Sequence, residues 1–226
     1  MTKPATNLIK LSLFIFVIIS FFYVFGNLSD STLVMVISTT LVIPSLAFFY
    51  SLKSERILIY ELILMLSWLG SVLILSNVFL YKISGIICFW GMILLLGYHI
   101  LKGLKEPLKI QLKNKNKKIL LTIHLGYLVG IIYYLSGMLG SFIYPIIFYG
   151  AFLIGTSFLS LLLYIEQKST SHLLLLIGVI MLVFSGTILA ILLFLKNLNV
   201  FQDSMRLIFY IGSEFFICLY FISPKE

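Results

Sequence analysis

Two carboxylates lie inside long apolar stretches of this sequence, where an ionisable side chain is costly. Glu61 lies four residues into a stretch that starts at Ile57, and Glu214 lies near the middle of the stretch Leu207–Ile222. A charge at the centre of a bilayer costs at least about 2.5–3.5 kcal/mol, so such acids are functional candidates. Glu61 lies about 6 Å from the end of its stretch at the helical rise, so its side chain reaches the interface. Glu214 lies about 10 Å from either end and must be protonated, paired or beside a wet cavity.

Small and polar residues lie at a similar depth in two other apolar stretches. The two patches are Ser67, Gly70 and Ser71, and Ser185, Gly186 and Thr187. Together with Glu214, and with Tyr210 one turn away on the same helix face, they predict a polar pocket near the midplane. The alternative is that these groups only hold helices together through hydrogen bonds.

The three histidines lie at the ends of apolar stretches. His99 ends one stretch and His124 begins another, both near the depth of Glu61, whereas His172 precedes a third. Packing at the interface explains a lone histidine better than catalysis does. No Cys or His spacing typical of a metal site occurs, nor any HExxH, Walker or GxSxG motif. We therefore expect neither a metal nor a cofactor.

The composition places these residues in a membrane protein. Hydrophobic residues make up 61% of the 226 residues and charged residues only 11%, against about 45–50% and about 25% in soluble domains. A soluble fold of this length could not bury that much apolar surface. The excess of basic over acidic residues, 16 to 8, lies beside apolar stretches, which indicates anionic lipid headgroups and not nucleic acid as partners.

Eight apolar stretches are long enough to cross a bilayer core of about 30 Å as helices. Their predicted bounds are 8–25, 32–52, 57–76, 83–101, 119–139, 142–165, 173–195 and 207–222. The sequence therefore predicts an all-α polytopic bundle that forms a single transmembrane domain over residues 1–226. The stretch 8–25 is interpreted as the first span, because its apolar core is longer than that of a signal peptide.

The basic residues predict that both ends of the chain are cytoplasmic. With that orientation, thirteen Lys and Arg residues lie inside and three outside, the three being Lys82, Lys196 and Arg206. Seven of the thirteen lie in the loop Lys102–Lys118, which alternates lysines with apolar residues. Such a loop can lie on the membrane surface with its lysines near lipid phosphates, although a basic loop that only sets the topology is the simpler interpretation.

Four segments carry a resemblance to a known family. They are MLSWLGSVL at 65–73, LGYH at 96–99, LVFSGTILA at 182–190 and FYIGSE at 209–214. With the eight spans, they resemble the YhhN-like family, the lysoplasmalogenases. That family has a Gly-Asp in the third span, a Ser-Asp in the seventh and a Gln in the last helix. Here Ser71 and Gly186 take the places of the two aspartates, and Glu214 takes the place of the Gln.

The resemblance implies hydrolysis of the vinyl-ether bond of a lysoplasmalogen, which yields an aldehyde and a glycerophospho-alcohol. This chemistry requires an acid that protonates the enol ether and a base that activates water. The expected catalytic residues are then Glu214 as the general acid, with Ser71 and Ser185 orienting water or the headgroup. The expected substrate contacts are Tyr210, His99 and Gly186.

The absence of both aspartates indicates a divergent member and leaves two other functions open. One is a lipid-binding or structural membrane protein without activity. The other is a small proton-coupled transporter that uses Glu214 as its protonatable group. The expected partners are membrane lipids, including a lysophospholipid substrate, and the expected location is the inner membrane of a bacterium.

Overall fold

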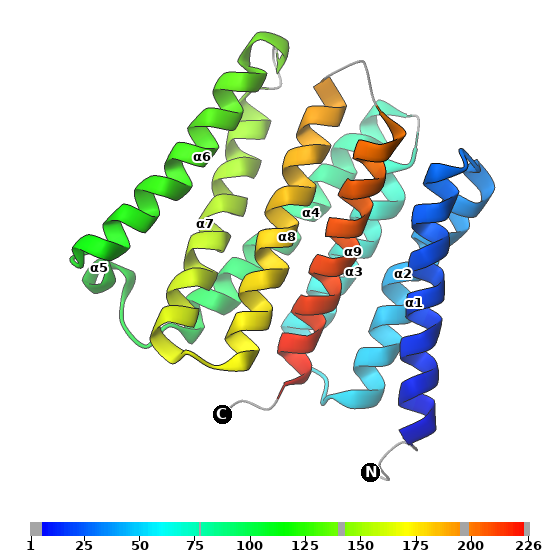
Figure 1. Cartoon of the computed structure of the whole chain (residues 1–226), viewed down its shortest axis with the longest axis horizontal. Helices are drawn as coiled ribbons and strands as arrows, with labels where there is room; N and C mark the ends of the chain where they lie inside the picture. The colour runs from blue at the N-terminus through cyan, green and yellow to red at the C-terminus, as the bar shows by residue number, and fades with distance from the viewer. Residues whose placement is uncertain (1–5, 77, 140–142, 195–198, 224–226) are drawn as a thin grey trace. The chain divides into compact units, whose positions relative to one another are not determined.

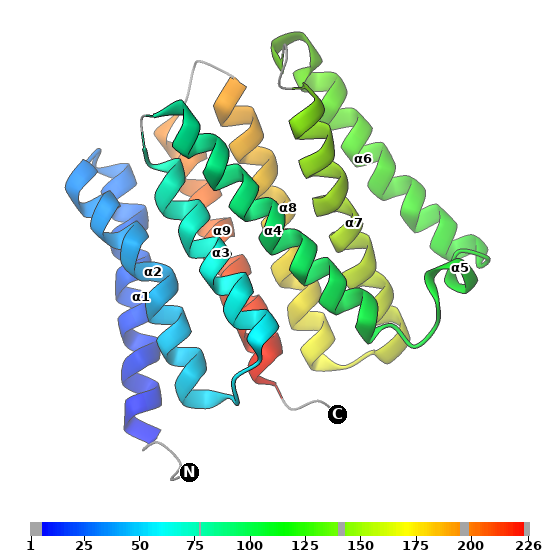
Figure 2. The same ribbon diagram turned by 180° about the vertical axis from the view of Figure 1, so that it is seen from behind.

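The computed structural model describes residues 6–76, 78–139, 143–194 and 199–223, and these form helices joined by short connections (Figures 1 and 2). The helices are α1 (Thr6–Leu28), α2 (Thr32–Lys53), α3 (Leu58–Ile74), α4 (Phe79–Gly103), α5 (Leu108–Gln111), α6 (Lys115–Leu139), α7 (Ile143–Gln167), α8 (Thr170–Phe194) and α9 (Val200–Ile222). No strand occurs in the described ranges.

Seven of these helices are long and apolar enough to cross a membrane, judged by length and composition. α3 is shorter, with 17 residues, which is the lower limit of about 17–25 residues for a spanning helix. The chain is thus an all-α, multi-pass membrane protein, and each of the eight predicted stretches corresponds to one long helix or to α3. The cytoplasmic orientation of the two ends stays a prediction.

Several helices extend beyond the apolar stretches that predicted them, because polar side chains cap their first turns. α6 begins at Lys115, where the Asn114 side chain accepts a hydrogen bond of 2.9 Å from the Asn116 amide. α9 begins seven residues before the predicted Leu207, and the Asn199 side chain accepts from the Phe201 amide at 3.1 Å. Asparagine is a preferred N-cap residue, whereas hydropathy detects only the part of a helix that lies in hydrocarbon.

The chain divides into two compact units, and the single transmembrane domain stays a prediction. The first unit runs to Leu95 and includes the end of α9 from Cys218. Within it, α1 lies side by side with α2, and α2 packs on α3 (Figures 1 and 2). α3 and α4 approach closely, because a Cβ atom on Gly70 would lie only 3.1 Å from the Gly85 carbonyl oxygen.

The second unit comprises Leu96–Ile217. α7 packs between α6 and α8, and α6 also contacts α8. α8 and α9 approach closely at Gly178, where an added Cβ atom would lie 3.1 Å from the Ser213 carbonyl oxygen. Gly126 and Gly130 form a GxxxG sequence, a pattern common at close helix contacts, but both face open space, since an added Cβ atom at either residue meets no atom within 4 Å.

Pro44 leaves one backbone carbonyl of α2 without its helical hydrogen bond, and a side chain of α3 supplies a donor. Pro44 has no amide hydrogen, so it cannot bond to the carbonyl of Thr40 four residues earlier. The indole nitrogen of Trp68, on α3, donates to that carbonyl at 2.9 Å. In hydrocarbon a freed backbone carbonyl must be satisfied by the protein itself, and this hydrogen bond both satisfies it and joins α2 to α3.

The first prediction is a coupling between these two residues. Trp68→Phe should lower the free energy of unfolding by about 1–3 kcal/mol, the cost of a buried unsatisfied polar group. In a Pro44→Ala background, the backbone amide of residue 44 can donate to the Thr40 carbonyl. There, Trp68→Phe should lower the free energy of unfolding by less than half as much. Denaturant unfolding of the full chain in detergent measures all four proteins of this double-mutant cycle.

Trp90→Phe is the matched control. Its indole nitrogen is buried and has no hydrogen-bond partner among the described residues, so replacing it removes aromatic area without removing a hydrogen bond. Equal costs for Trp68→Phe in both backgrounds would contradict the assignment.

Candidate functional site

Glu214 lies on the buried face of α9. Only 1% of its surface is exposed, and Tyr210 one turn earlier is 5% exposed. Buried residues follow helical spacing along this face at Leu207, Tyr210, Glu214, Ile217 and Phe221. Because residues three and four apart share a helix face, the Glu214 carboxyl group points into the protein, on the same face as Tyr210.

Ser185 is displaced from Glu214 along the helices. Its hydroxyl donates to the carbonyl of Arg206 on α9 at 3.1 Å. Arg206 lies eight residues before Glu214, which is about 12 Å along the helix axis. At the level of Glu214, α8 instead presents Gly178, which lies against the Ser213 carbonyl. The expectation that Ser185 and Glu214 share one depth is therefore wrong, because hydropathy does not report the register between α8 and α9.

Ser185, Gly186 and Thr187 are consecutive on α8 and face three different neighbours. Ser185 bonds to α9, as described above. Gly186 faces α7, since a Cβ atom there would lie 3.1 Å from the Tyr149 hydroxyl. The Thr187 hydroxyl is 2.9 Å from that of Tyr127 on α6. Consecutive residues of a helix point about 100° apart, so these groups hold three helices together and do not converge on one pocket.

Ser71 belongs to the first unit. It is 6% exposed on α3, and its hydroxyl donates to the Ser67 carbonyl at 2.8 Å. Ser67 and Gly70 are buried on the same face, which confirms the predicted small-residue face. Gly70 is used for the close approach to α4.

The histidines make local contacts. His99 is half-buried on α4. The Nδ1 atom of His124 is 2.8 Å from the Leu120 carbonyl oxygen, and its Nε2 atom is 3.5 Å from the Ser157 hydroxyl of α7. Since a carbonyl only accepts, Nδ1 carries a hydrogen and donates it to Leu120. His172 contacts the side chain of Ser169, the residue before α8.

His124 also lines a cleft of about 190 Å³ among α6, α7 and α8. The lining residues are Ile123, His124, Tyr127, Ile154, Ser157, Ile180, Val183 and Phe184. This lining is mostly apolar and includes no carboxyl group, so this cleft cannot supply the acid that vinyl-ether hydrolysis requires.

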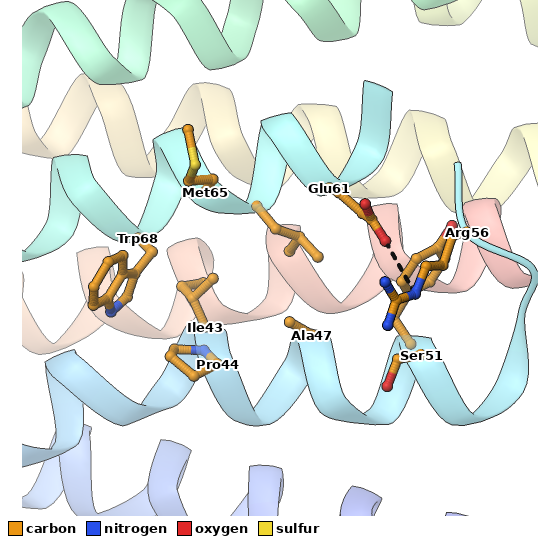
Figure 3. A pocket seen from close by; sticks show the side chains of 10 residues that line it. Ile43, Pro44, Ala47, Ser51, Arg56, Glu61, Met65 and Trp68 are labelled. Carbon is orange, nitrogen blue, oxygen red and sulfur yellow. Dashed lines mark ion pairs between the residues drawn. The ribbon is translucent and has the colours of Figure 1, made fainter. Parts of the chain in front are cut away.

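A larger cleft, of about 430 Å³, lies between α2 and α3. Figure 3 shows Pro44, Trp68 and Met65 at one end and the Arg56–Glu61 ion pair at the other. The Arg56 Nε and Glu61 Oε1 atoms are 3.7 Å apart, and the side chains are 80% and 40% exposed. The exposure of Glu61 agrees with its predicted reach to the interface. Its pairing with a loop arginine five residues away was not predicted, although that spacing was visible in the sequence.

The basic loop is attached to the end of α7. The Glu166 carboxylate accepts hydrogen bonds from the Lys105 amide at 3.0 Å and from the Gln111 side chain at 2.6 Å. Gln111 is 1% exposed and accepts a hydrogen bond of 2.7 Å from Lys117. The other six lysines of the loop are exposed. The loop is therefore fixed by Glu166, which the sequence analysis missed, and still presents its positive charge outward.

Among the described residues, no three or more His, Cys, Asp or Glu side chains are grouped so that they could hold a metal ion. Comparisons with models of known families, with curated proteins and with solved structures found no match to this chain.

The second prediction concerns the attachment of the basic loop. Glu166→Ala should make trypsin cleave the loop about tenfold faster. Losing a hydrogen bond to a charged acceptor costs about 1.5 kcal/mol. Each 1.4 kcal/mol changes the equilibrium between the closed and the open loop about tenfold, and cleavage follows the open population. Time courses of cleavage on the purified full chain measure the change.

Glu106→Ala is the matched control, since Glu106 is exposed in the same loop and accepts from Gln111 only through its backbone. It should leave the rate unchanged. Equal acceleration by both substitutions would show that charge, and not the Glu166 hydrogen bonds, protects the loop.

Proposed function

We propose that this chain is a membrane-embedded hydrolase of lysophospholipids, which cleaves the vinyl ether of a lysoplasmalogen with Glu214 as its acid. The observation that carries the proposal is a carboxyl group in the middle of an apolar helix, 1% exposed and on the face that points into the protein. An ionisable residue inside a membrane span is costly and marks a functional site by default. The resemblance to the lysoplasmalogenases supports the choice of substrate.

One carboxyl group can carry the reaction if it acts twice. As an acid, Glu214 donates its proton to the β-carbon of the vinyl ether, which leaves an oxocarbenium ion at the carbon bonded to oxygen. As the resulting carboxylate, it accepts a proton from the water that attacks that carbon. The hemiacetal then collapses to a fatty aldehyde and the glycerophospho-alcohol. One water is consumed, and Glu214 ends in its starting form.

Tyr210 is placed to assist, because the i, i+4 spacing keeps it beside Glu214 on the buried face. Ser185 lies about 12 Å along α9 from Glu214 and takes no part in this step, and the Ser71 hydroxyl donates to the Ser67 carbonyl within its own unit. His99 keeps its proposed role as a substrate contact, whereas Gly186 packs against Tyr149 of α7 and loses that role.

The second candidate is a lipid-binding membrane protein without turnover. It is favoured by the commitment of Ser185 and Thr187 to contacts between helices and by the absence of both family aspartates. It predicts saturable binding of lysolipid that Glu214→Gln leaves intact.

The third prediction is that purified full-length protein releases aldehyde from lysoplasmalogen and that Glu214→Gln lowers kcat by at least about 100-fold. Positioned general acids contribute about 10²–10⁴-fold, and the amide retains the shape of the side chain but cannot donate such a proton. Aldehyde release is measured in detergent across pH 5–9.

Glu106→Gln, in the exposed loop, serves as the control and should keep the wild-type rate. A Glu214→Gln protein with the wild-type rate would exclude Glu214 as the acid. If the wild type releases no aldehyde, the hydrolase proposal is wrong, and a lysolipid-binding measurement on the same samples then tests the second candidate.

A further inference from the structure

The cleft between α2 and α3 has the size of a ligand site. Its volume of about 430 Å³ lies within the range of about 300–1,000 Å³ that small-molecule sites occupy. Its lining consists of Ile43, Pro44, Ala47, Tyr50, Ser51, Arg56, Glu61, Leu64, Met65 and Trp68. All of these residues belong to the first unit.

Hydrogen bonds fix both ends of this cleft. At the apolar end, the Trp68 indole donates to the Thr40 carbonyl of α2. At the charged end, the Tyr50 hydroxyl donates to the Glu55 carbonyl at 2.9 Å and accepts from the Ile57 amide at 3.0 Å. Tyr50 thereby holds the α2–α3 connection that carries Arg56. The cleft is therefore preformed and does not depend on a bound ligand.

The two ends differ in chemistry. Arg56 and Glu61 lie at one end, and Pro44 and Trp68 lie at the other (Figure 3). Glu61 and Trp68 are seven residues apart on α3, which is about 11 Å along the axis. One leaflet of a bilayer core of about 30 Å is about 15 Å deep. An acyl chain that starts beside the charged pair would thus lie in the cleft for most of a leaflet.

The charged pair selects the headgroup. An arginine pairs with a phosphate through two parallel hydrogen bonds, and a carboxylate accepts hydrogen bonds from a primary ammonium. Phosphoethanolamine carries both groups a few bonds apart. A choline headgroup cannot donate a hydrogen bond to Glu61, and an anionic headgroup such as phosphoglycerol would place only negative charge beside it.

We propose that this cleft binds a phosphatidylethanolamine-type lipid, with its phosphate on Arg56, its ammonium on Glu61 and one acyl chain along Ala47 towards Trp68. This site is separate from the proposed hydrolysis. Lipid binding there involves no turnover, and its test does not depend on the role of Glu214.

The test uses the fluorescence of Trp68 in the full chain. The Trp90→Phe variant leaves Trp68 as the single tryptophan, since the chain has two. It is reconstituted in phosphatidylcholine nanodiscs that contain increasing fractions of lipid brominated in one acyl chain, with an ethanolamine, choline or glycerol headgroup. Half-maximal quenching should need about tenfold less brominated ethanolamine lipid than choline lipid, the effect of one charge-assisted hydrogen bond. The Trp68→Phe variant leaves Trp90, outside the cleft lining, and should be quenched equally by all three.

Three substitutions in the Trp90→Phe background separate the contributions. Glu61→Gln should abolish the preference for ethanolamine over choline and improve quenching by the glycerol lipid. Arg56→Gln should weaken quenching by the ethanolamine and choline lipids about tenfold. Ala47→Phe should fill the cleft and remove the excess quenching, whereas Ala151→Phe, at an exposed position of α7, should not.

Equal quenching by the ethanolamine and choline lipids in the starting protein would overturn the proposal. So would an ethanolamine preference that survives Glu61→Gln, or excess quenching that survives Ala47→Phe. Arg56 and Glu61 are exposed on the surface, and exposed ion pairs contribute little to folding. Loss of the folded state therefore does not complicate the two charge substitutions.

Discussion

In hydrocarbon no water completes the hydrogen bonds of the backbone, so each carbonyl that a helix leaves free must find a donor on the same protein. Pro44 creates such a carbonyl at Thr40, and the indole of Trp68 satisfies it from the next helix. Ser185 makes another hydrogen bond between helices, from α8 to the Arg206 carbonyl of α9. The position of α2 against α3 depends on the first of these bonds, and that of α8 against α9 depends on the second together with Gly178, which lets the two backbones approach.

The same constraint distinguishes polar side chains that hydrogen-bond to backbone carbonyls from polar side chains that the helices do not need. Hydroxyl groups within spans commonly bond to the carbonyl three or four residues earlier, as Ser71 and Thr187 do. Such a hydroxyl is neutral and inexpensive to bury. A carboxyl group is different, because no helix needs it to complete its backbone and burying it is costly. Glu214 therefore remains the strongest functional candidate after the serines have been assigned to helix contacts.

The sequence predicted the helices well because the length of an apolar stretch is a local property, which hydropathy reads directly. It also predicted the buried face of α9, since helical periodicity places Tyr210 and Glu214 together. It could not predict the register between helices, which is set by contacts between residues far apart in the chain. For that reason Ser185 was expected at the depth of Glu214, although it lies level with Arg206. The attachment of the basic loop by Glu166 was missed for the same reason.

The cleft between α2 and α3 and the carbonyl freed by Pro44 have the same structural origin. Pro44, Ala47 and Ser51 are spaced by three and four residues, so they share one face of α2, and their small side chains leave space against α3. Trp68 crosses that space to reach the carbonyl that Pro44 frees, and so closes one end of it. A proline with alanine and serine at helical spacing, opposite a tryptophan on the next span, is therefore a sequence pattern that predicts a groove open to lipid. In the proposed lipid site, Arg56 of the connecting loop and Glu61 of the first turn of α3 then determine which headgroup the groove accepts.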